Sequence, residues 1–117
     1  MTAQSNMNYE LSEEMQSLVY WSSIYSPADQ DIDSIRAAYD AMCLHYTLPR
    51  DGTVNIEDRV VPHITHPVNV RLYSPLGEAP EKGWSCVVYI HGGGWMVGNL
   101  DSHEFITRYL CRDLNVV

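Results

Sequence analysis

The spacing of apolar positions divides the chain into a helical first part and a β-rich second part. Apolar residues recur at helical spacing in residues 11–25 and again in residues 35–46. Pro27 ends the first segment. Pro49 requires the second segment to stop by Leu48, because the residue before a proline disfavours helical geometry. We therefore predict two helices, and either Asp31 or Asp33 is able to cap the second.

The polar and apolar positions after the turn at residues 50–52 are typical of strands. Two runs, 54–61 and 68–73, are rich in β-branched residues, and the second alternates between its two faces. The short proline-containing connection at 63–67 favours an antiparallel hairpin. Residues 74–85 contain two prolines and two glycines and predict a surface loop.

An uninterrupted apolar run, residues 86–90, then leads into the three glycines at 92–94. Such a run, bounded by turn residues, predicts a strand buried on both faces, as in parallel sheets. A helix is expected next, because Asp101 and Glu104 have the offset of a capping box, and Asn115 ends it. Its expected buried face consists of Phe105, Ile106, Tyr109, Leu110 and Leu114.

The predicted strand is followed by the glycine turn, the helix and two apolar residues, Val116 and Val117, which would begin a second buried strand. This order is that of a βαβ unit whose second strand is incomplete. The predicted fold class is therefore α/β. We divide the chain into a disordered polar leader at 1–9, a helical segment at 10–49 and an incomplete core at 50–117. Because a domain rarely ends as a core strand begins, we expect this chain to be the N-terminal part of a longer protein.

Composition and charge exclude several classes of partner. The net charge of -8 argues against nucleic acid and against anionic membrane surfaces. No secretory signal and no run long enough for a membrane span are visible in the sequence, so a cytoplasmic location is the default expectation. The odd number and wide spacing of Cys43, Cys86 and Cys111 predict buried reduced thiols. Trp21 could be a core residue or a pocket wall, and we favour the core.

Glycine-rich turns between a strand and a helix serve two common chemistries. A dinucleotide fingerprint starting at Gly92 and Gly94 would need its third glycine where Val97 stands, and no Gly-Lys pair follows for a P-loop. Phosphate binding is therefore disfavoured. The alternative is an oxyanion hole, in which adjacent backbone N–H groups stabilise the negative oxygen of a tetrahedral intermediate.

The stretch from His91 to Trp95 (His-Gly-Gly-Gly-Trp) resembles the oxyanion loop of α/β-hydrolases related to hormone-sensitive lipase, and among them the bacterial acetyl esterases. Residues 98–104 and 70–75 are also similar to that family. The resemblance implies the N-terminal part of an α/β-hydrolase fold. In that fold, residues 10–49 would supply cap helices, an antiparallel β-hairpin would follow, and a mainly parallel sheet would then begin.

The resemblance also implies roles for the loop residues. The N–H groups of Gly93 and Gly94 would be the oxyanion donors, and Gly92 would shape the turn. His91 would brace the loop through hydrogen bonds, and Trp95 would line the substrate pocket. Neither a cofactor nor a metal is implied.

The family's Gly-x-Ser-x-Gly nucleophile elbow does not occur in this sequence. We expect the nucleophilic serine, and the aspartate and histidine of the triad, beyond Val117. His45, His63 and His66 are not substitutes, because nothing in the sequence brings them near a serine, and a two-histidine metal site lacks a third ligand pattern.

The sequence thus predicts a serine carboxylesterase or lipase that hydrolyses short-chain acyl esters and takes a small ester as its partner. The 117-residue fragment alone should be inactive and would need the remainder of the hydrolase chain. One alternative is a hydrolase-like ligand-binding protein without catalysis. Another is a truncated assembly protein whose exposed sheet edge pairs with another chain, which includes a homodimer.

Overall fold

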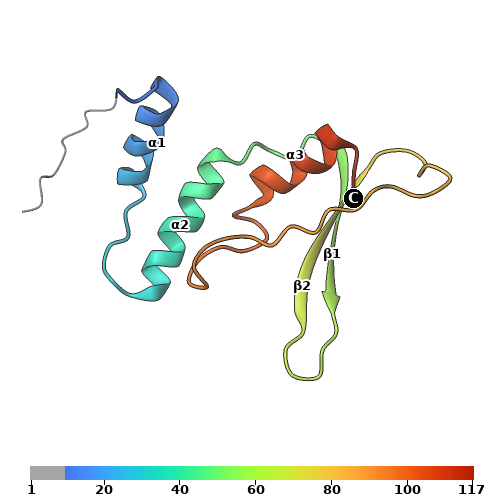
Figure 1. The fold of residues 1–117 in the computed structure, drawn as a ribbon. Helices are drawn as coiled ribbons and strands as arrows, with labels where there is room; N and C mark the ends of the chain where they lie inside the picture. Colours follow the sequence, from blue (N-terminus) through green and yellow to red (C-terminus); the bar gives the residue numbers. More distant parts are fainter. Residues whose placement is uncertain (1–9) are drawn as a thin grey trace, which may run out of the picture.

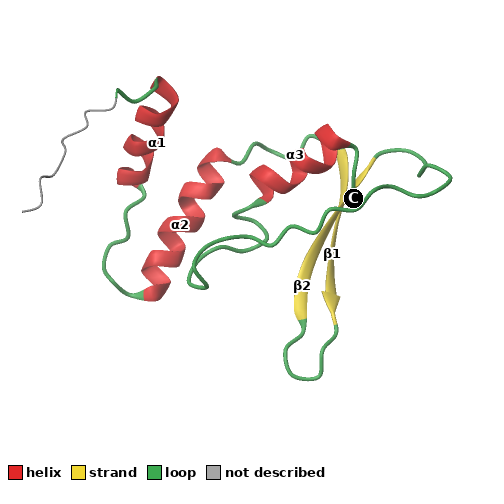
Figure 2. Ribbon diagram, viewed as in Figure 1, coloured by secondary structure: helices red, strands yellow, loops and turns green. Residues whose placement is uncertain are grey.

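The computed structural model describes residues 10–117, and the predicted leader at 1–9 lies outside the described residues. A pair of helices lies at one end of the molecule, a β-hairpin projects from the other, and a third helix lies between them (Figure 1). A long irregular segment joins the hairpin to the third helix (Figure 2). In chain order the elements are α1 (Glu13–Ile24), α2 (Ile32–Tyr46), β1 (Val54–Val61), β2 (Val68–Pro75) and α3 (Glu104–Leu114).

The two predicted N-terminal helices are confirmed. The Ser12 side chain accepts a hydrogen bond from the N–H of Met15, and two acids in the first turn of α1 suit the positive end of the helix dipole. Asp31 caps α2 in the same way by accepting from the N–H of Asp33. α2 ends at Tyr46, before Pro49, as the proline requires.

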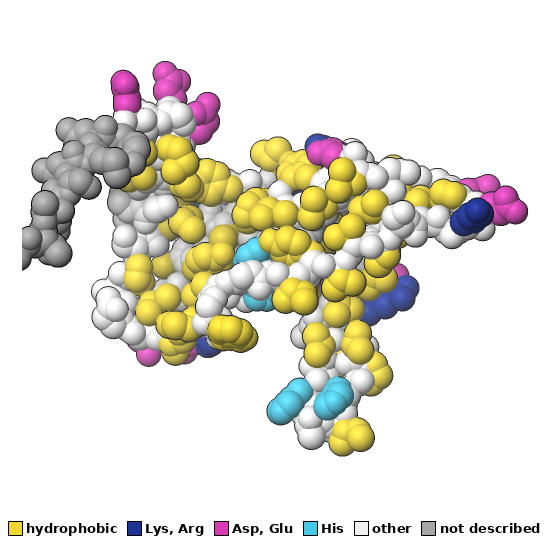
Figure 3. Space-filling view, in the orientation of Figure 1, with side chains coloured by type: hydrophobic (Ala, Val, Ile, Leu, Met, Phe, Trp, Pro, Cys, Tyr) yellow, Lys and Arg dark blue, Asp and Glu magenta, His cyan; other side chains and the backbone are white. Residues whose placement is uncertain are grey.

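α1 is held loosely against α2. It contains no buried residue, and its contacts with α2 include the Trp21 ring, whose centroid lies 4.1 Å from that of His45 on α2. Trp21 is therefore half-buried between two helices, and the favoured assignment to a core is wrong. Figure 3 shows hydrophobic side chains exposed over both helices.

The predicted antiparallel hairpin is also confirmed. Val54 of β1 lies opposite Pro75 of β2, and Val61 lies opposite Val68. β2 runs two residues further than the predicted end at Tyr73. α3 packs on this hairpin, and Val54, Tyr73 and Cys111 form the small buried core between them.

The strand predicted at residues 86–90 differs from the structure in two respects. The segment is irregular, and Val88 and Ile90 are 82% and 87% exposed, so burial on both faces is wrong. The physical reason is that no element among the described residues covers this segment. Two backbone hydrogen bonds do join it to Val117, one from the N–H of Val87 and one to the carbonyl of Ser85. Bonds that flank one residue in this way are those of neighbouring parallel strands.

The buried face of α3 is polar, which corrects the prediction. Glu104, Arg108 and Cys111 are buried, whereas Leu114 is exposed and the other four predicted apolar positions are only half-buried. The helix ends at Asn115 as predicted, and this residue adopts the left-handed conformation.

The three cysteines are free thiols, and Cys43 and Cys111 are buried as predicted. Burial raises the pKa of both thiols. Cys86 is exposed, so for this residue the prediction of burial is wrong. None of the helices in residues 10–117 combines the length and the hydropathy needed to cross a bilayer.

Candidate functional site

The glycine stretch forms a tight turn that closes on itself. The carbonyl of Gly93 accepts hydrogen bonds from the N–H groups of Met96 at 3.0 Å and Val97 at 3.1 Å. A side chain at position 93 would overlap the carbonyl oxygen of Val97. The turn therefore requires glycine at 93 for steric reasons, independently of any chemistry.

Three successive residues of this turn have positive φ angles. These angles are 127° at Gly93, 59° at Gly94 and 57° at Trp95. For a non-glycine residue the left-handed region costs roughly 1–2 kcal/mol, so Trp95 holds an unfavourable conformation. Its side chain is fully exposed and contributes no burial in return. Unfavourable conformations of this kind are concentrated at functional sites.

The N–H groups at the centre of the turn are available to a ligand. Among residues 10–117, no backbone or side-chain acceptor receives a hydrogen bond from the N–H of Gly93 or Gly94. Gly94 is exposed and has open space around its α-carbon, and Gly93 is half-buried. The turn therefore offers two adjacent donors without a side chain between them and the solvent.

His91 lies at the entrance of the turn and contacts its backbone. The Nδ1 atom of His91 is 2.7 Å from the carbonyl oxygen of Gly92. The chain returns past the same ring at Gly98, where a side chain would come within 2.8 Å of His91 Nδ1 and 2.9 Å of the Gly92 oxygen. Gly98 also has a φ of 98°. Glycine at 98 thus allows the two ends of the loop to lie against each other.

Asn99 connects this loop to the turn before α3, and the N-cap residue of the helix, His103, makes no side-chain capping hydrogen bond. The side-chain oxygen of Asn99 accepts from the N–H groups of Asp101 and Ser102, and the Ser102 hydroxyl accepts from the N–H of Asn99 at 2.8 Å. The capping box of Asp101 and Glu104 is therefore wrong. Both carboxylates are instead bound by arginines, so neither caps the helix.

A cluster of charged side chains, which sequence patterns did not indicate, lies beneath the loop and α3. Glu104 accepts two hydrogen bonds from Arg50, at 2.8 and 2.7 Å, and a third from Arg71 at 2.8 Å. Arg71 also binds the carboxylates of Asp58 and Asp101. Hydrogen bonds from Arg50 lower the pKa of Glu104, and those to Asp58 raise the pKa of Arg71. We call these five residues the Glu104 cluster.

Arg108 lies beside this cluster and joins α3 to the chain that follows α2. Its side chain is buried, with the residue only 1% exposed, and it donates to the carbonyls of Leu48 and Pro49 at 2.7 and 3.0 Å. Local sequence patterns could not predict these contacts, because the bonded residues are 59 and 60 positions apart along the chain.

An open groove of about 570 Å³ lies on the α2 side of this region. Its lining includes Asp40 and Leu44 of α2, Pro49, and Asn99 beyond the glycine loop. None of residues 91–98 contributes to it. The groove is therefore separate from the free N–H groups.

The remaining histidines lie apart from the glycine loop or carry structural contacts. His63 and His66 occupy the exposed hairpin connection, and His45 stacks on Trp21. In the part of the chain that the structure describes, no three His, Cys, Asp or Glu side chains are grouped so as to hold a metal ion.

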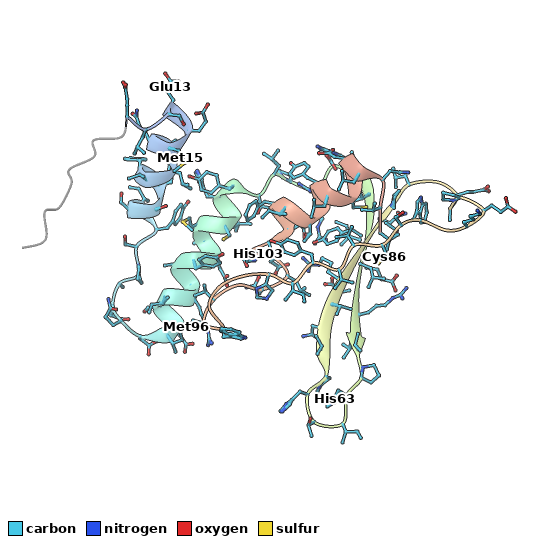
Figure 4. The ribbon with its side chains drawn as sticks, viewed as in Figure 1. Glu13, Met15, His63, Cys86, Met96 and His103 are labelled. Atoms are coloured by element: carbon cyan, nitrogen blue, oxygen red, sulfur yellow. The ribbon has the colours of Figure 1, made fainter. Side chains whose placement is uncertain are left out.

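His103 is buried at the start of α3, with its ring centroid 4.9 Å from that of His91 and its Nδ1 atom 3.0 Å from the Ser102 hydroxyl (Figure 4). Burial, and secondly the neighbouring His91, lower its pKa below the ordinary value of 6.5. The unfolded chain therefore binds a proton at a higher pH than the folded chain does. The contribution of His103 to stability is complete above pH 6.5 and is lost as the pH falls through the lowered pKa.

We expect His103→Phe, which keeps an aromatic ring but cannot be protonated, to flatten the pH dependence of the free energy of unfolding between about pH 7.5 and 5. Urea denaturation across this range measures the effect. An unaltered slope in the His103→Phe variant would contradict the assignment.

Residues 87–117 match the family model described as the alpha/beta hydrolase fold. The matched region contains the glycine loop and α3. The resemblance to α/β-hydrolases is therefore confirmed over these residues.

Individual relatives extend the similarity beyond this region. The chain is 33% identical over 88 residues to the carboxylic ester hydrolase LipN of Mycobacterium tuberculosis, which is 75% of this chain and 22% of that protein. It is 35% identical over 86 residues to an acetyl esterase of Salmonella paratyphi B, or 74% of this chain and 25% of the relative. It is 41% identical over 51 residues to an ethyl acetate hydrolase of Pseudomonas putida, which is 44% of this chain and 16% of that protein. The chain thus spans a quarter or less of the length of these relatives.

Proposed function

We propose that this chain is the N-terminal part of a serine carboxylesterase that hydrolyses short-chain acyl esters, and that it contributes the oxyanion-hole loop. The observation that carries the proposal is the pair of unpaired N–H groups at Gly93 and Gly94, in a turn whose backbone only glycine fits at position 93. The similarity to a carboxylic ester hydrolase, an ethyl acetate hydrolase and an acetyl esterase supports the same chemistry.

In this proposal the loop acts on charge that develops during the reaction. A serine of the full-length enzyme attacks the ester carbonyl while a histidine accepts its proton, and the carbonyl oxygen becomes negative. The N–H groups of Gly93 and Gly94 donate hydrogen bonds to that oxygen. Collapse of the intermediate releases the alcohol, and water then releases the acyl group from the serine.

The neighbouring residues take supporting roles. Gly92 shapes the turn, and the contact of His91 with the Gly92 carbonyl braces it. A histidine whose ring lies against its own loop backbone is poorly placed to serve as the general base. The exposed Trp95 lines the acyl pocket.

The same proposal assigns the rest of the chain. Residues 10–49 form cap helices over the acyl pocket, and residues 50–117 form the first strands and first helix of the hydrolase core. The two hydrogen bonds that Val117 makes with residues 85 and 87 support the start of a parallel sheet at Cys86.

Hydrolysis of p-nitrophenyl acetate tests the proposal. We expect the full-length protein to turn over this ester and an organophosphate that modifies reactive serines to abolish the activity. Residues 1–117 alone should show no turnover, because no nucleophile elbow occurs in them. Turnover by the purified fragment would contradict the proposal that the nucleophile lies outside residues 1–117. A full-length protein that binds but does not hydrolyse the ester would support the ligand-binding alternative.

A further inference from the structure

The outer part of the glycine loop, residues 96–99, is held by side chains of α2. The Nε atom of Arg36 donates to the carbonyl of Met96 at 2.7 Å, and the side-chain amide of Asn99 donates to a carboxylate oxygen of Asp40 at 2.9 Å. The partners are about 60 residues apart along the chain. Figure 4 shows Met96 where the loop turns back beside α2.

The two α2 residues are four positions apart, which places them on one face of the helix. They contact the loop three residues apart, at its tip and at the point where it leads into α3. Within residues 91–98, the backbone hydrogen bonds are those from the N–H groups of Met96 and Val97 to the Gly93 carbonyl. The contacts with Arg36 and Asp40 therefore fix the outer part of the loop against α2, while Asn99 joins it to the turn before α3.

We propose that Arg36 and Asp40 are positioning residues, which fix the orientation of the Gly93 and Gly94 N–H groups by holding the loop at Met96 and Asn99. This inference rests on the proposed function, because it assigns a task to contacts around the same loop. It also links the helical segment to the reaction, so that a displacement of α2 changes the oxyanion donors directly.

Of the two contacts, the one at Asp40 has the wider effect. Asn99 also accepts from the N–H groups of Asp101 and Ser102, so its orientation sets the turn between the loop and α3. Asp40 is half-buried, whereas the Arg36 side chain is 51% exposed. Removing Asp40 leaves the Asn99 amide without its carboxylate acceptor.

The first arm of the test is catalytic and uses the full-length protein. We expect D40A to lower kcat for p-nitrophenyl acetate roughly 10-fold to 100-fold, the scale of a misplacement of about 1 Å, with KM nearly unchanged. D40N should restore most of the activity, because its amide oxygen still accepts the Asn99 hydrogen bond. D113A is the control, since Asp113 is also an acid bound to an arginine, its side chain is 57% exposed, and it lies in the last turn of α3.

The second arm is spectroscopic and does not depend on catalysis. In protein labelled with 15N-glycine, D40A and R36M should shift the amide signals of Gly93, Gly94 and Gly98. The signals of Gly52 and Gly77, which lie elsewhere in the chain, should stay in place and report that the fold is intact. R36M removes the guanidinium group of a side chain that is 51% exposed, so this variant should fold and can be measured even if D40A does not fold.

Several outcomes would overturn the proposal. These are loop signals in R36M and D40A that match the wild type, a change in KM in place of kcat, or D40N as impaired as D40A. If the wild-type protein hydrolyses no ester, the proposed function fails, but the shifts of the glycine signals still decide whether α2 positions the loop.

Discussion

Replacing Glu104 by glutamine is expected to lower the free energy of unfolding by about 3 kcal/mol, the lower end of the range for breaking a buried ion pair from one side. Glu104 is the shared partner of Arg50 and Arg71, and the Arg71 side chain is only 8% exposed. The neutral amide leaves this buried cation with less negative charge and presents N–H donors to arginine donors. Urea denaturation at neutral pH measures the change.

The chain offers a matched control in Glu57. It also makes a two-point contact with an arginine, Arg59, at 2.8 Å for both bonds, but both side chains are exposed. Solvent screens such a pair, so Glu57→Gln should leave the denaturation midpoint almost unchanged. Equal effects of the two substitutions would show that burial of the Glu104 cluster is not what stabilises this region.

Glu104 also gives this region a predictable acid sensitivity. Its pKa is lowered by the hydrogen bonds from Arg50, so the stabilisation is present above the ordinary value of 4.5 and is lost as the pH falls through the lowered pKa. The Glu104→Gln variant should lack this part of the acid transition.

Gly93→Ala is expected to reduce the ester turnover of the full-length enzyme by about 100-fold to 1,000-fold, the effect of losing one oxyanion-hole donor. The new methyl group would overlap the Val97 carbonyl, and the φ of 127° is unfavourable for alanine. The turn must then open, which rotates the N–H groups away from the reacting oxygen. Steady-state kinetics with p-nitrophenyl acetate measures the loss.

Gly83→Ala controls for the cost of a positive φ alone. Gly83 has a φ of 78° in a surface loop, with open space where a side chain would lie. We expect full turnover in this variant at a temperature where it is folded. Near-normal turnover in Gly93→Ala would show that Gly93 does not present a donor, and a loss in both variants would point to general destabilisation.

The local elements of this protein follow directly from the sequence. The aspartate cap of α2, the stop before Pro49 and the hairpin after the turn at 50–52 depend on neighbouring residues, and the structure confirms each of them. The glycine loop was also apparent, because a run of three glycines between an apolar stretch and a helix is costly unless the backbone is needed there. Its role as an oxyanion hole stays a prediction.

Only the tertiary structure decided which side of α3 is buried and what holds the glycine loop. Apolar periodicity predicted burial of Leu114, yet Glu104 and Arg108 are the buried positions. Arginines from distant parts of the chain bind the Glu104 carboxylate, and the carbonyls of residues 48 and 49 accept hydrogen bonds from Arg108. The capping-box offset of Asp101 and Glu104 was misleading for the same reason. Local sequence determines where helices, strands and turns form, whereas pairing between charges 30 to 54 residues apart depends on how those elements pack.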